Sequence, residues 1–248
     1  MRLAGKKALV TGAAQGLGEE TALALAEEGC DVAAFDLRAE ELGRLTGRIR
    51  DLGRDALDLE VDVRDFAAVQ ESVGRVYDRF ERLDILVNNA GKGQREQFRD
   101  LTREVWDYML DVNLTSVFNL CSAVVPRMVS AGSGTIVNVS SVAALRGGRL
   151  LGKTAYAAAK AGVIGFTKSL AYELAPLGIT VNCIAPGVHN TPRRARDTEE
   201  ERERIMAGVP MKKLGEPRDL AQTVVFLCLP SSGYITGVVL PQDGGHSI

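Results

Sequence analysis

Short apolar runs alternate with longer amphipathic stretches along the whole chain. The short runs are rich in Val, Ile, Leu and Ala, as is typical of buried strands, and lie at 7–11, 31–36, 56–63, 84–91, 134–141, 178–187 and 237–241. The longer stretches have the composition and apolar spacing of helices, and lie at 17–29, 38–51, 66–80, 102–131, 154–175 and 217–228. This alternation predicts about seven strands connected by helices.

Strands separated by helices of this length favour right-handed crossovers and a parallel sheet covered on both faces. No linker rich in Pro or Ser and no short repeat divides the chain. We therefore expect an α/β fold in which residues 1–248 form a single Rossmann-like, doubly wound domain.

Composition excludes several classes of function. Thirty Lys and Arg against 32 Asp and Glu give a net charge of −2, which provides no basic field for nucleic acid or an anionic membrane. Two histidines and four scattered cysteines argue against a metal site and against a disulfide framework. No apolar run reaches the ~18 residues of a membrane span, and no signal peptide is recognisable. A cytoplasmic protein without a metal is the expectation.

Glycines follow the first predicted strand directly. Gly12, Gly16 and Gly18 lie between this strand and the first helix, with Gln15 and Leu17 in the same turn. Glycines there allow backbone N–H groups to approach a pyrophosphate at the positive end of the helix. The position of this turn, more than its composition, predicts a dinucleotide site.

Asp36 ends the second predicted strand, about 20 residues after the glycines. A carboxylate there accepts hydrogen bonds from the adenosine ribose and repels the 2′-phosphate of NADP, so NAD is the expected cofactor. Arg38 is close enough to complicate this choice, and a helix N-cap is the structural alternative for Asp36.

The remaining strand ends are also polar or glycine-containing. Because ligands bind beyond the carboxyl ends of parallel strands, these residues are expected to converge. Asp62 and Val63 are candidates to contact an adenine. The other candidates are Asn89, Ala90 and Gly91 after the fourth strand, Ser140 and Ser141 after the fifth, and Pro186, Gly187 and Val188 after the sixth.

Tyr156 and Lys160 are four residues apart in an alanine-rich stretch, and so lie on one face of a helix. A free tyrosine has a pKa of about 10, and a nearby cation favours its phenolate. Alone, such a pair is most often surface decoration.

Taken together, these motifs resemble those of the short-chain dehydrogenase/reductase family over essentially the whole chain. The matching segments are T-G-x-x-x-G-x-G at 11–18, N-N-A-G at 88–91, Y-x-x-x-K at Tyr156 and Lys160, and P-G at 186–187. The resemblance implies that Asn113 and Ser141 complete the catalytic set, and that Thr191 contacts the cofactor's carboxamide. It also implies a homotetramer built through the helices at 102–131 and 154–175.

The spacing of the catalytic serine departs from the family pattern. In the family it commonly lies about 13 residues before the tyrosine, whereas Ser141 lies 15 before Tyr156. A two-residue insertion in "LRGGRLLGK" explains the difference. Neighbouring strand residues face opposite ways, so Ser140 is the competing assignment, and we favour Ser141.

The expected roles follow from the resemblance and from acid–base chemistry. Tyr156 acts as general acid or base, and Ser141 hydrogen-bonds the substrate oxygen. Lys160 lowers the tyrosine pKa and binds the nicotinamide ribose, and Asn113 holds a water that relays protons.

The leading interpretation is an NAD-dependent oxidoreductase that interconverts a secondary alcohol, or a 3-hydroxy compound, and its ketone. The alternative within enzymes is a 3-oxoacyl-thioester reductase acting on acyl carrier protein or coenzyme A substrates. Such reductases more often use NADPH, which Asp36 disfavours. An alternative of another class is a non-catalytic dinucleotide-binding partner subunit, and the complete catalytic set argues against it.

Residues 188–216 are expected to form a lid over the substrate, with a short helix begun by the capping box of Thr198 and Glu201. Trp106, Tyr108 and Met109 are interpreted as packing residues. A group of basic residues near the expected mouth is consistent with an anionic substrate, either a carboxylate or an acyl thioester, but ordinary surface charge is the favoured interpretation. These residues are Lys92, Arg95, Arg146, Arg149, Lys153, Arg193, Arg194 and Arg196.

Overall fold

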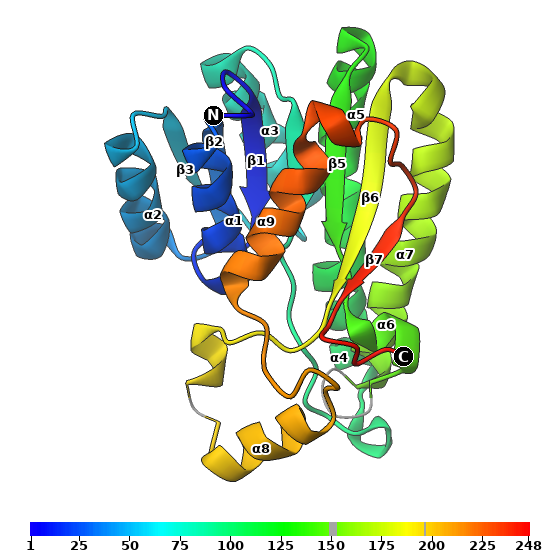
Figure 1. Cartoon of the computed structure of the whole chain (residues 1–248). Coiled ribbons are helices and arrows are strands. Elements are labelled where there is room, and N and C mark those ends of the chain that lie inside the picture. The colour runs from blue at the N-terminus through cyan, green and yellow to red at the C-terminus, as the bar shows by residue number, and fades with distance from the viewer. Residues whose placement is uncertain (149–152, 196) are drawn as a thin grey trace.

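A parallel sheet forms the centre of the molecule, in a computed structural model that describes residues 1–148, 153–195 and 197–248. Within these residues the sheet has seven strands in the order β3-β2-β1-β4-β5-β6-β7, all paired in parallel (Figure 1). The strands are β1 (Lys7–Thr11), β2 (Asp31–Asp36), β3 (Ala56–Glu60), β4 (Ile85–Asn88), β5 (Gly134–Val139), β6 (Ile179–Pro186) and β7 (Val239–Gln242). The predicted Rossmann-like α/β fold is confirmed.

Helices cover both faces of the sheet and enclose two apolar cores. Helices α1 (Gly16–Glu27), α2 (Ala39–Asp51) and α9 (Pro217–Cys228) pack on one face, and α3 (Phe66–Phe80), α5 (Ser116–Ala131) and α7 (Thr154–Leu174) on the other. Adjacent residues of β1 show why both faces must be covered. Ala8 and Val10 belong to the first core and Leu9 to the second, so the strand is apolar on both sides.

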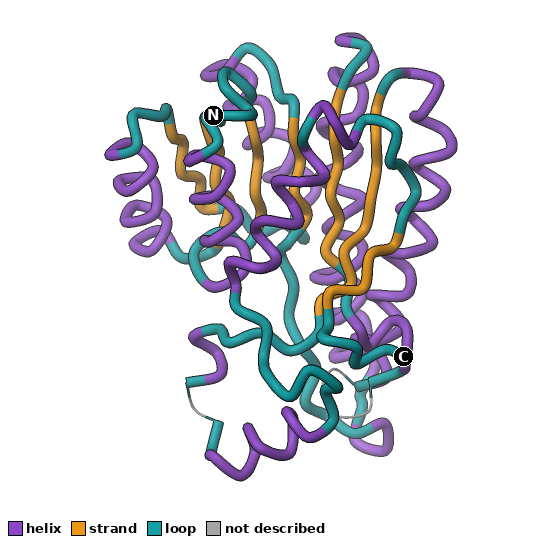
Figure 2. The backbone as a smooth tube through the Cα atoms, viewed as in Figure 1, coloured by secondary structure: helices purple, strands orange, loops and turns teal. Residues whose placement is uncertain are grey.

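The strand order reverses direction at β1. From β1 the chain proceeds outward through β2 to β3, and then returns to place β4 on the opposite side of β1. In sheets of this kind, a crevice opens at the carboxyl ends of the strands beside that switch point. The strands in Figure 1 point downward, and Figure 2 shows loops gathered at their lower ends.

The 188–216 segment extends below this edge and carries α8 (Glu199–Ala207). The Thr198–Glu201 capping box is present, as the sequence predicted. His189 and Gly215 form a parallel β-bridge, which joins the two ends of the segment at its base. The segment is therefore a closed excursion from the sheet edge.

The long helical stretch at 102–131 is not uniform. It consists of α4 (Arg103–Leu110), a single π-helical turn (Asp111–Thr115) and α5. Such π-turns are often found at functional sites, and this one contains Asn113. Within the described residues, Arg103–Ala131 is also the one stretch long and apolar enough to cross a membrane by composition. Val117, Leu120 and Val124 are nevertheless buried in the second core, so these residues pack against the sheet.

The five-residue helix α6 (Val142–Arg146) was not predicted, because one turn and a half shows no periodicity. Ser141 is its N-cap, and the Ser141 hydroxyl accepts a hydrogen bond from Ala143 N at 3.1 Å. The fifth strand thus ends before the two serines.

Candidate active site

A cavity of about 430 Å³ opens at the carboxyl ends of the central strands. It lies where the strand order reverses, so segments far apart in sequence meet there. Most of the residues that we predicted for the site line it: Gly12, Gln15, Gly16, Leu17, Asp36, Asp62, Val63, Asn89, Ala90, Gly91, Ser141, Tyr156, Lys160, Pro186, Gly187, Val188 and Thr191. Gly18 and Asn113 lie behind the lining.

The glycine turn has the backbone that its sequence requires. Gly12 and Gly16 adopt φ angles of +65° and +60°, which favour glycine. A Cβ on Gly12 would lie 2.8 Å from Ala90 Cα, and one on Gly18 would lie 2.1 Å from the carbonyl oxygen of Gly12. Gly18 therefore allows α1 to pack against the turn, while the start of α1 faces the cavity.

The Asp36 carboxylate is fixed by backbone donors. Ala14 N donates to Oδ2 at 3.0 Å and Leu37 N donates to Oδ1 at 2.8 Å. Arg38 Nε lies 3.7 Å from Oδ1, and Arg38 also donates to Gln15 Oε1 at 2.9 Å. Since Arg38 is the N-cap residue of α2, Asp36 is not a helix cap.

Asp62 lines the cavity but its carboxylate is already paired. Arg64 Nε lies 3.0 Å from both oxygens, and Arg64 Nη2 donates to Oδ2 at 2.5 Å. The hydrogen bond from Arg64 holds the pKa of the Asp62 carboxyl below its usual value. Contact of Asp62 with an adenine stays a prediction, and any such contact would be made by a carboxylate shared with Arg64.

The loop after β4 is clamped to the glycine turn. Asn89 Nδ2 donates to the carbonyl oxygens of Thr11 and Gly12 at 3.0 and 3.1 Å. Thr11 Oγ1 accepts from the backbone N–H groups of Asn89 and Ala90 at 3.1 and 3.0 Å. These four bonds connect the ends of β1 and β4, which are neighbours in the sheet.

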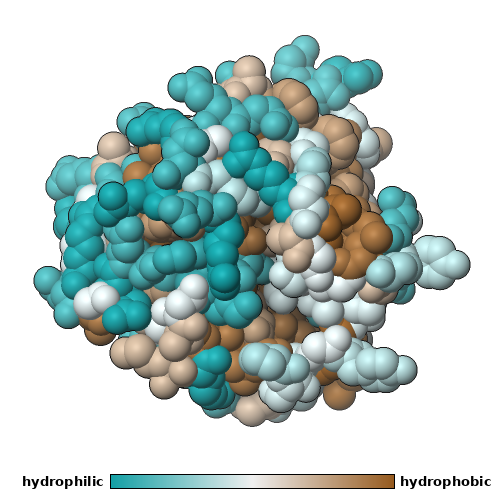
Figure 3. Space-filling view, turned by 90° about the horizontal axis from the view of Figure 1, so that it is seen from above, coloured by the Kyte–Doolittle hydropathy of each residue, from teal (hydrophilic) through white to brown (hydrophobic). Residues whose placement is uncertain are grey.

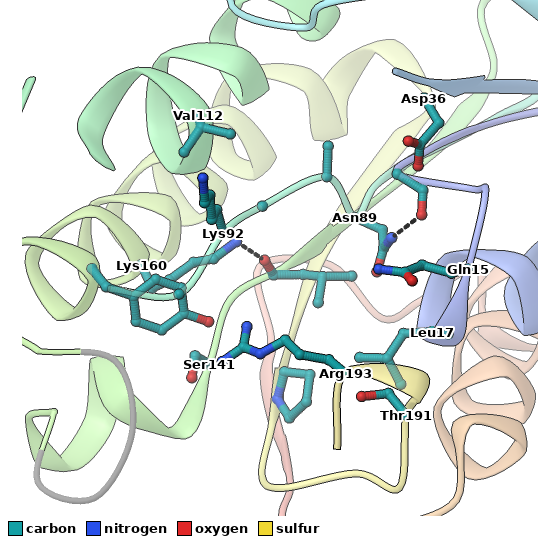
Figure 4. A pocket seen from close by; sticks show the side chains of 18 of the residues that line it. Gln15, Leu17, Asp36, Asn89, Lys92, Val112, Ser141, Lys160, Thr191 and Arg193 are labelled. Carbon is teal, nitrogen blue, oxygen red and sulfur yellow. Dashed lines mark hydrogen bonds between the residues drawn. The ribbon is translucent and has the colours of Figure 1, made fainter. Parts of the chain in front are cut away.

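Lys160 lines the cavity but is almost completely buried, with 3% of its surface exposed. Its Nζ donates to the carbonyl oxygen of Val139 at 2.8 Å (Figure 4), and burial lowers its pKa to about 8. A Cβ on Gly91 would lie 3.2 Å from this Nζ, so glycine leaves room in front of the ammonium group.

Burial raises the pKa of Tyr156, while a hydrogen bond with Ser141 and the positive charge of Arg193 lower it. We expected Lys160 to lower the pKa of Tyr156 as well. That effect stays a prediction, since the ammonium group of Lys160 donates to the carbonyl oxygen of Val139. The influence of Arg193 could not be read from the sequence, since 37 residues separate the two side chains.

The two serines have different surroundings. Ser140 Oγ donates to the carbonyl oxygen of Lys160 at 2.7 Å, and only 3% of Ser140 is exposed. The Ser141 side chain instead hydrogen-bonds with that of Tyr156. Both serines line the cavity, but the Ser140 hydroxyl ties the end of β5 to α7, and the Ser141 hydroxyl is the one that interacts with Tyr156.

Asn113 is fully buried in the π-turn. Its Nδ2 donates to the carbonyl oxygens of Lys92 and Met109, both at 3.0 Å, and its Oδ1 accepts from Lys92 N at 3.0 Å. The side chain therefore clamps the loop that follows N-N-A-G. The proton-relay role of Asn113 stays a prediction.

The first part of the 188–216 segment forms part of the cavity wall. Thr191 lies against the glycine turn, because a Cβ on Gly16 would be 3.4 Å from Thr191 Cγ2. His189 is buried at the base, and its Nδ1 lies 3.2 Å from the carbonyl oxygen of Gly187. Burial lowers the pKa of His189, which favours its neutral form.

Some lining residues were missed or misjudged from the sequence. Tyr108, interpreted as packing, lines the cavity, and Lys92 Nζ lies 5.0 Å from its ring centroid. Hydrophobic periodicity could not distinguish a half-buried cavity residue from a core one. Further lining residues that we did not assign to the site are Leu37, Val61, Arg64, Gly93, Val112, Val139 and Val142.

The predicted basic group separates into several environments. Lys92, Arg193 and Arg194 line the cavity, and Arg194 Nη1 is paired with Asp197 Oδ2 at 2.7 Å. Arg146 donates to the carbonyl oxygen of His246 near the C-terminus. Arg149 and Arg196, like the 149–152 part of the inferred insertion, lie outside the described residues. In the described ranges no group of His, Cys, Asp or Glu is arranged to hold a metal ion.

Comparison with known proteins adds independent evidence. A family model described as enoyl-(acyl carrier protein) reductase matches residues 12–247. The 3-oxoacyl-[acyl-carrier-protein] reductase FabG of Thermotoga maritima is 42% identical over 99% of both chains. The (2S)-[(R)-hydroxy(phenyl)methyl]succinyl-CoA dehydrogenase subunit BbsD of Thauera aromatica is 41% identical over 100% of this chain and 99% of its own.

A solved structure from Sinorhizobium meliloti, described as a short-chain alcohol dehydrogenase, superposes with a TM-score of 0.93 at 36% identity. The match covers 98% of this chain and 97% of that one. The glycine turn, the N-N-A-G loop and the Tyr156–Lys160 pair meet at one cavity on this fold. The chain belongs to the short-chain dehydrogenase/reductase family, whose members are oxidoreductases that bind a nicotinamide dinucleotide.

Proposed function

We propose that the protein interconverts the 3-hydroxyacyl and 3-oxoacyl forms of an acyl thioester, with NAD(H) as its cofactor. The observation that carries the proposal is the placement of Tyr156 and Ser141 in one cavity with a dinucleotide-type glycine turn. Two hydroxyl groups that interact with each other can both contact one substrate oxygen.

The names of the relatives support the thioester as substrate class. One is a reductase of 3-oxoacyl groups on acyl carrier protein, and the other a dehydrogenase subunit for a hydroxyl-bearing acyl-CoA. Both are more than 40% identical to this chain over nearly its full length. The thioester alternative from the sequence is therefore better supported than a simple secondary alcohol, although the reaction at the carbinol carbon is the same.

The cavity fits a dinucleotide in several ways. The positive-φ glycines expose backbone at the start of α1, and any Cβ on Gly91 would lie 2.8 Å from Asn113 Oδ1 and fill the space before Lys160. Asp36 supports NAD over NADP, because its fixed carboxylate would repel a 2′-phosphate. The chemistry that a bound nicotinamide dinucleotide supplies is hydride transfer.

Proton handling is assigned to the chain's own residues. Tyr156, whose pKa is raised by burial, remains protonated at neutral pH and can donate to the oxygen of a ketone. Ser141 donates a second hydrogen bond to this oxygen and stabilises its developing charge. We assign Lys160 to bind the nicotinamide ribose. Asn113 fixes the loop after β4 through its hydrogen bonds to Lys92.

The surroundings of the site are assigned in the same way. We assign the 188–216 segment as a substrate lid, since it closes the cavity through Thr191 and Val188. A homotetramer and a cytoplasmic location remain part of the proposal, together with a single catalytic domain over the whole chain.

A cofactor and substrate panel tests the proposal. We expect a higher kcat/KM with NADH than with NADPH, and with 3-oxoacyl thioesters than with simple ketones of equal size. Asp36→Ala should reduce the ratio of NADH to NADPH efficiency by about tenfold or more, because it removes a charge-assisted contact to the ribose. Tyr156→Phe should abolish turnover and still bind NADH normally. Faster reduction of simple ketones, or substantial turnover by Tyr156→Phe, would refute the proposal.

A further inference from the structure

A second cavity of about 630 Å³ adjoins the active site. Four residues line both cavities and so form the opening between them: Lys92, Gly93, Tyr108 and Arg193. The remaining wall of the second cavity comes from the loop after β4 and from α4: Arg95, Glu96, Glu104, Val105 and Met109. A substrate held at Tyr156 can therefore extend through this opening.

Arg193 lies across Gly93 at the opening. A Cβ on Gly93 would be 2.9 Å from Arg193 Nη2 and 3.0 Å from Nη1, so the guanidinium lies directly against the Gly93 backbone. In Figure 4 the side chain reaches from the lid toward Ser141. Among the described residues, Arg193 has no carboxylate within ion-pair distance, in contrast to its neighbour Arg194.

Lys92 provides a second cation at the same opening. Its backbone is clamped by the Asn113 amide on both its N–H and its carbonyl group. Its ammonium group lies over the Tyr108 ring, which Arg64 also approaches at 4.8 Å. Within the described ranges Lys92 also forms no ion pair, so two positive charges at the opening are unneutralised.

The acidic residues of the second cavity do not cancel these charges at the opening. Glu96 and Glu104 line the second cavity only, and Glu96 Oε2 accepts a hydrogen bond from Arg95 N at 3.2 Å. An anion at the opening would therefore meet Arg193 and Lys92 first.

We propose that Arg193 and Lys92 bind a carboxylate carried on the acyl part of the substrate, which makes acyl thioesters with a second acid group the preferred substrates. The inference rests on the proposed thioester reaction. The planar fork of arginine matches a carboxylate through two parallel hydrogen bonds.

A phosphate of the thioester carrier is the other possible anion. It is separated from the reacting carbon by the long pantetheine arm, whereas Arg193 acts electrostatically on Tyr156 itself. The closeness of Arg193 to the reacting centre therefore favours an acid group on the acyl chain.

The test compares two thioesters that lack a carrier phosphate: the N-acetylcysteamine thioesters of 3-oxohexanoate and of 3-oxohexanedioate. In the wild type we expect kcat/KM to be about tenfold higher for the dicarboxylate, the effect of one partly exposed charge-assisted contact. Arg193→Gln should lower kcat/KM for the dicarboxylate about tenfold more than for the neutral thioester, so the ratio between the two substrates falls to about one, while Arg193→Lys should restore part of this ratio. Any effect of Arg193 on Tyr156 itself changes both substrates alike and cancels in the ratio. Arg204→Gln is the matched control, because Arg204 is an exposed lid arginine outside both cavities.

Dissociation constants of the same two thioesters, measured on the NAD⁺-loaded protein, separate the two proposals. If neither thioester is reduced but the dicarboxylate binds more tightly in an Arg193-dependent way, the reaction is wrong and the anion site stands. Equal kcat/KM and equal affinity for both thioesters would overturn the anion site. A loss in Arg193→Gln confined to coenzyme A thioesters would overturn it in favour of a carrier phosphate.

Discussion

Ser140 and Ser141 are adjacent, yet their hydroxyl groups contact different parts of the molecule. The Ser140 hydroxyl donates a hydrogen bond to the carbonyl oxygen of Lys160 on α7. The Ser141 hydroxyl faces the cavity and Tyr156. Both serines follow the end of β5: Ser140 N still donates to the carbonyl oxygen of Ile184 on β6, whereas Ser141 already begins α6 as its N-cap.

We expect Ser141→Ala to lower kcat by about one hundredfold, because a hydrogen bond to the developing oxyanion is lost. Ser140→Ala is the matched control, and should lower the free energy of unfolding by about 1 kcal/mol with a smaller effect on kcat. Steady-state kinetics and urea unfolding of both variants check this. A larger kcat loss in Ser140→Ala would reverse the assignment.

Lys160 gives the site a measurable dependence of stability on pH. Burial lowers its pKa from the ordinary 10.5 to about 8 in the folded state. Between these values the unfolded chain binds more protons than the folded one, so the free energy of unfolding rises with pH. Full charging of the buried group, below pH 8, costs about 3 kcal/mol.

We therefore compare the free energy of unfolding of Lys160→Met with that of the wild type at pH 7 and at pH 10. The variant-minus-wild-type difference should be about 2 kcal/mol more favourable to the variant at pH 7. The lost hydrogen bond to Val139 does not affect this comparison, because it is missing at both pH values. Urea unfolding without added dinucleotide measures the difference. A difference that is independent of pH would show that Lys160 has an ordinary pKa.

At the scale of elements, the position of α7 depends on a residue far away in sequence. The N-cap residue of α7, Lys153, makes no side-chain capping bond. Instead the buried Gln94 side chain accepts from Ala155 N and Tyr156 N at 2.8 and 3.1 Å. Two of the four free N–H groups at the helix start are satisfied by the loop after β4.

Gln94→Ala should lower the free energy of unfolding by about 1–2 kcal/mol, since two buried donors lose their acceptor. One of these donors is the backbone N–H of Tyr156, so its loss should disturb the position of the catalytic tyrosine. We therefore expect kcat to fall by a larger factor than KM changes. Gln94→Glu keeps the acceptor at the positive end of the helix and should recover most of kcat.

Gln70→Ala is the control for Gln94. It removes the hydrogen bond from Gln70 Nε2 to Ser122 between α3 and α5, away from the site. Comparable destabilisation with unchanged kcat is expected. If Gln94→Ala likewise leaves kcat unchanged, the bond has only a structural role.

At the scale of the whole molecule, apolar surface remains uncovered on α3 and α5. Phe66 and Phe118 stack at 6.5 Å between ring centroids, and each is about half exposed. Figure 3 views the molecule from above Figure 1 and shows that this face also has apolar patches among mostly hydrophilic residues. Phe118 lies on α5, one of the helices expected to pair subunits, and Phe66 extends the exposed apolar surface onto the neighbouring α3, which supports the proposed homotetramer.

Phe118→Asp should shift the protein toward smaller oligomers, because it would bury a charge at the proposed subunit contact. Light scattering coupled to gel filtration gives the mass. Phe98→Asp, at a more exposed phenylalanine outside this contact, is the control. An unchanged mass for Phe118→Asp would exclude this face from the interface.

Most of the fold could be predicted because its signals are local. Alternating runs located the strands, and the capping box located the start of α8. The strands predicted at 56–63, 84–91 and 134–141 end earlier, at Glu60, Asn88 and Val139, because the residues that follow leave the sheet and line the cavity. The last two strands shift by one or two residues at their ends. The helix α6 and the π-turn gave no periodic signal, because each is only five residues long.

The sequence by itself determined the strand and helix order, the glycine turn and the helical spacing of Tyr156 and Lys160. These depend on backbone propensity and on neighbours a few residues away. Only the tertiary structure decided which serine faces Tyr156, that Gln94 caps α7, and that Arg193 lies at the opening between the two cavities. Those contacts join residues whose distance in space is set by the packing of the sheet and its loops, and no local pattern encodes that distance.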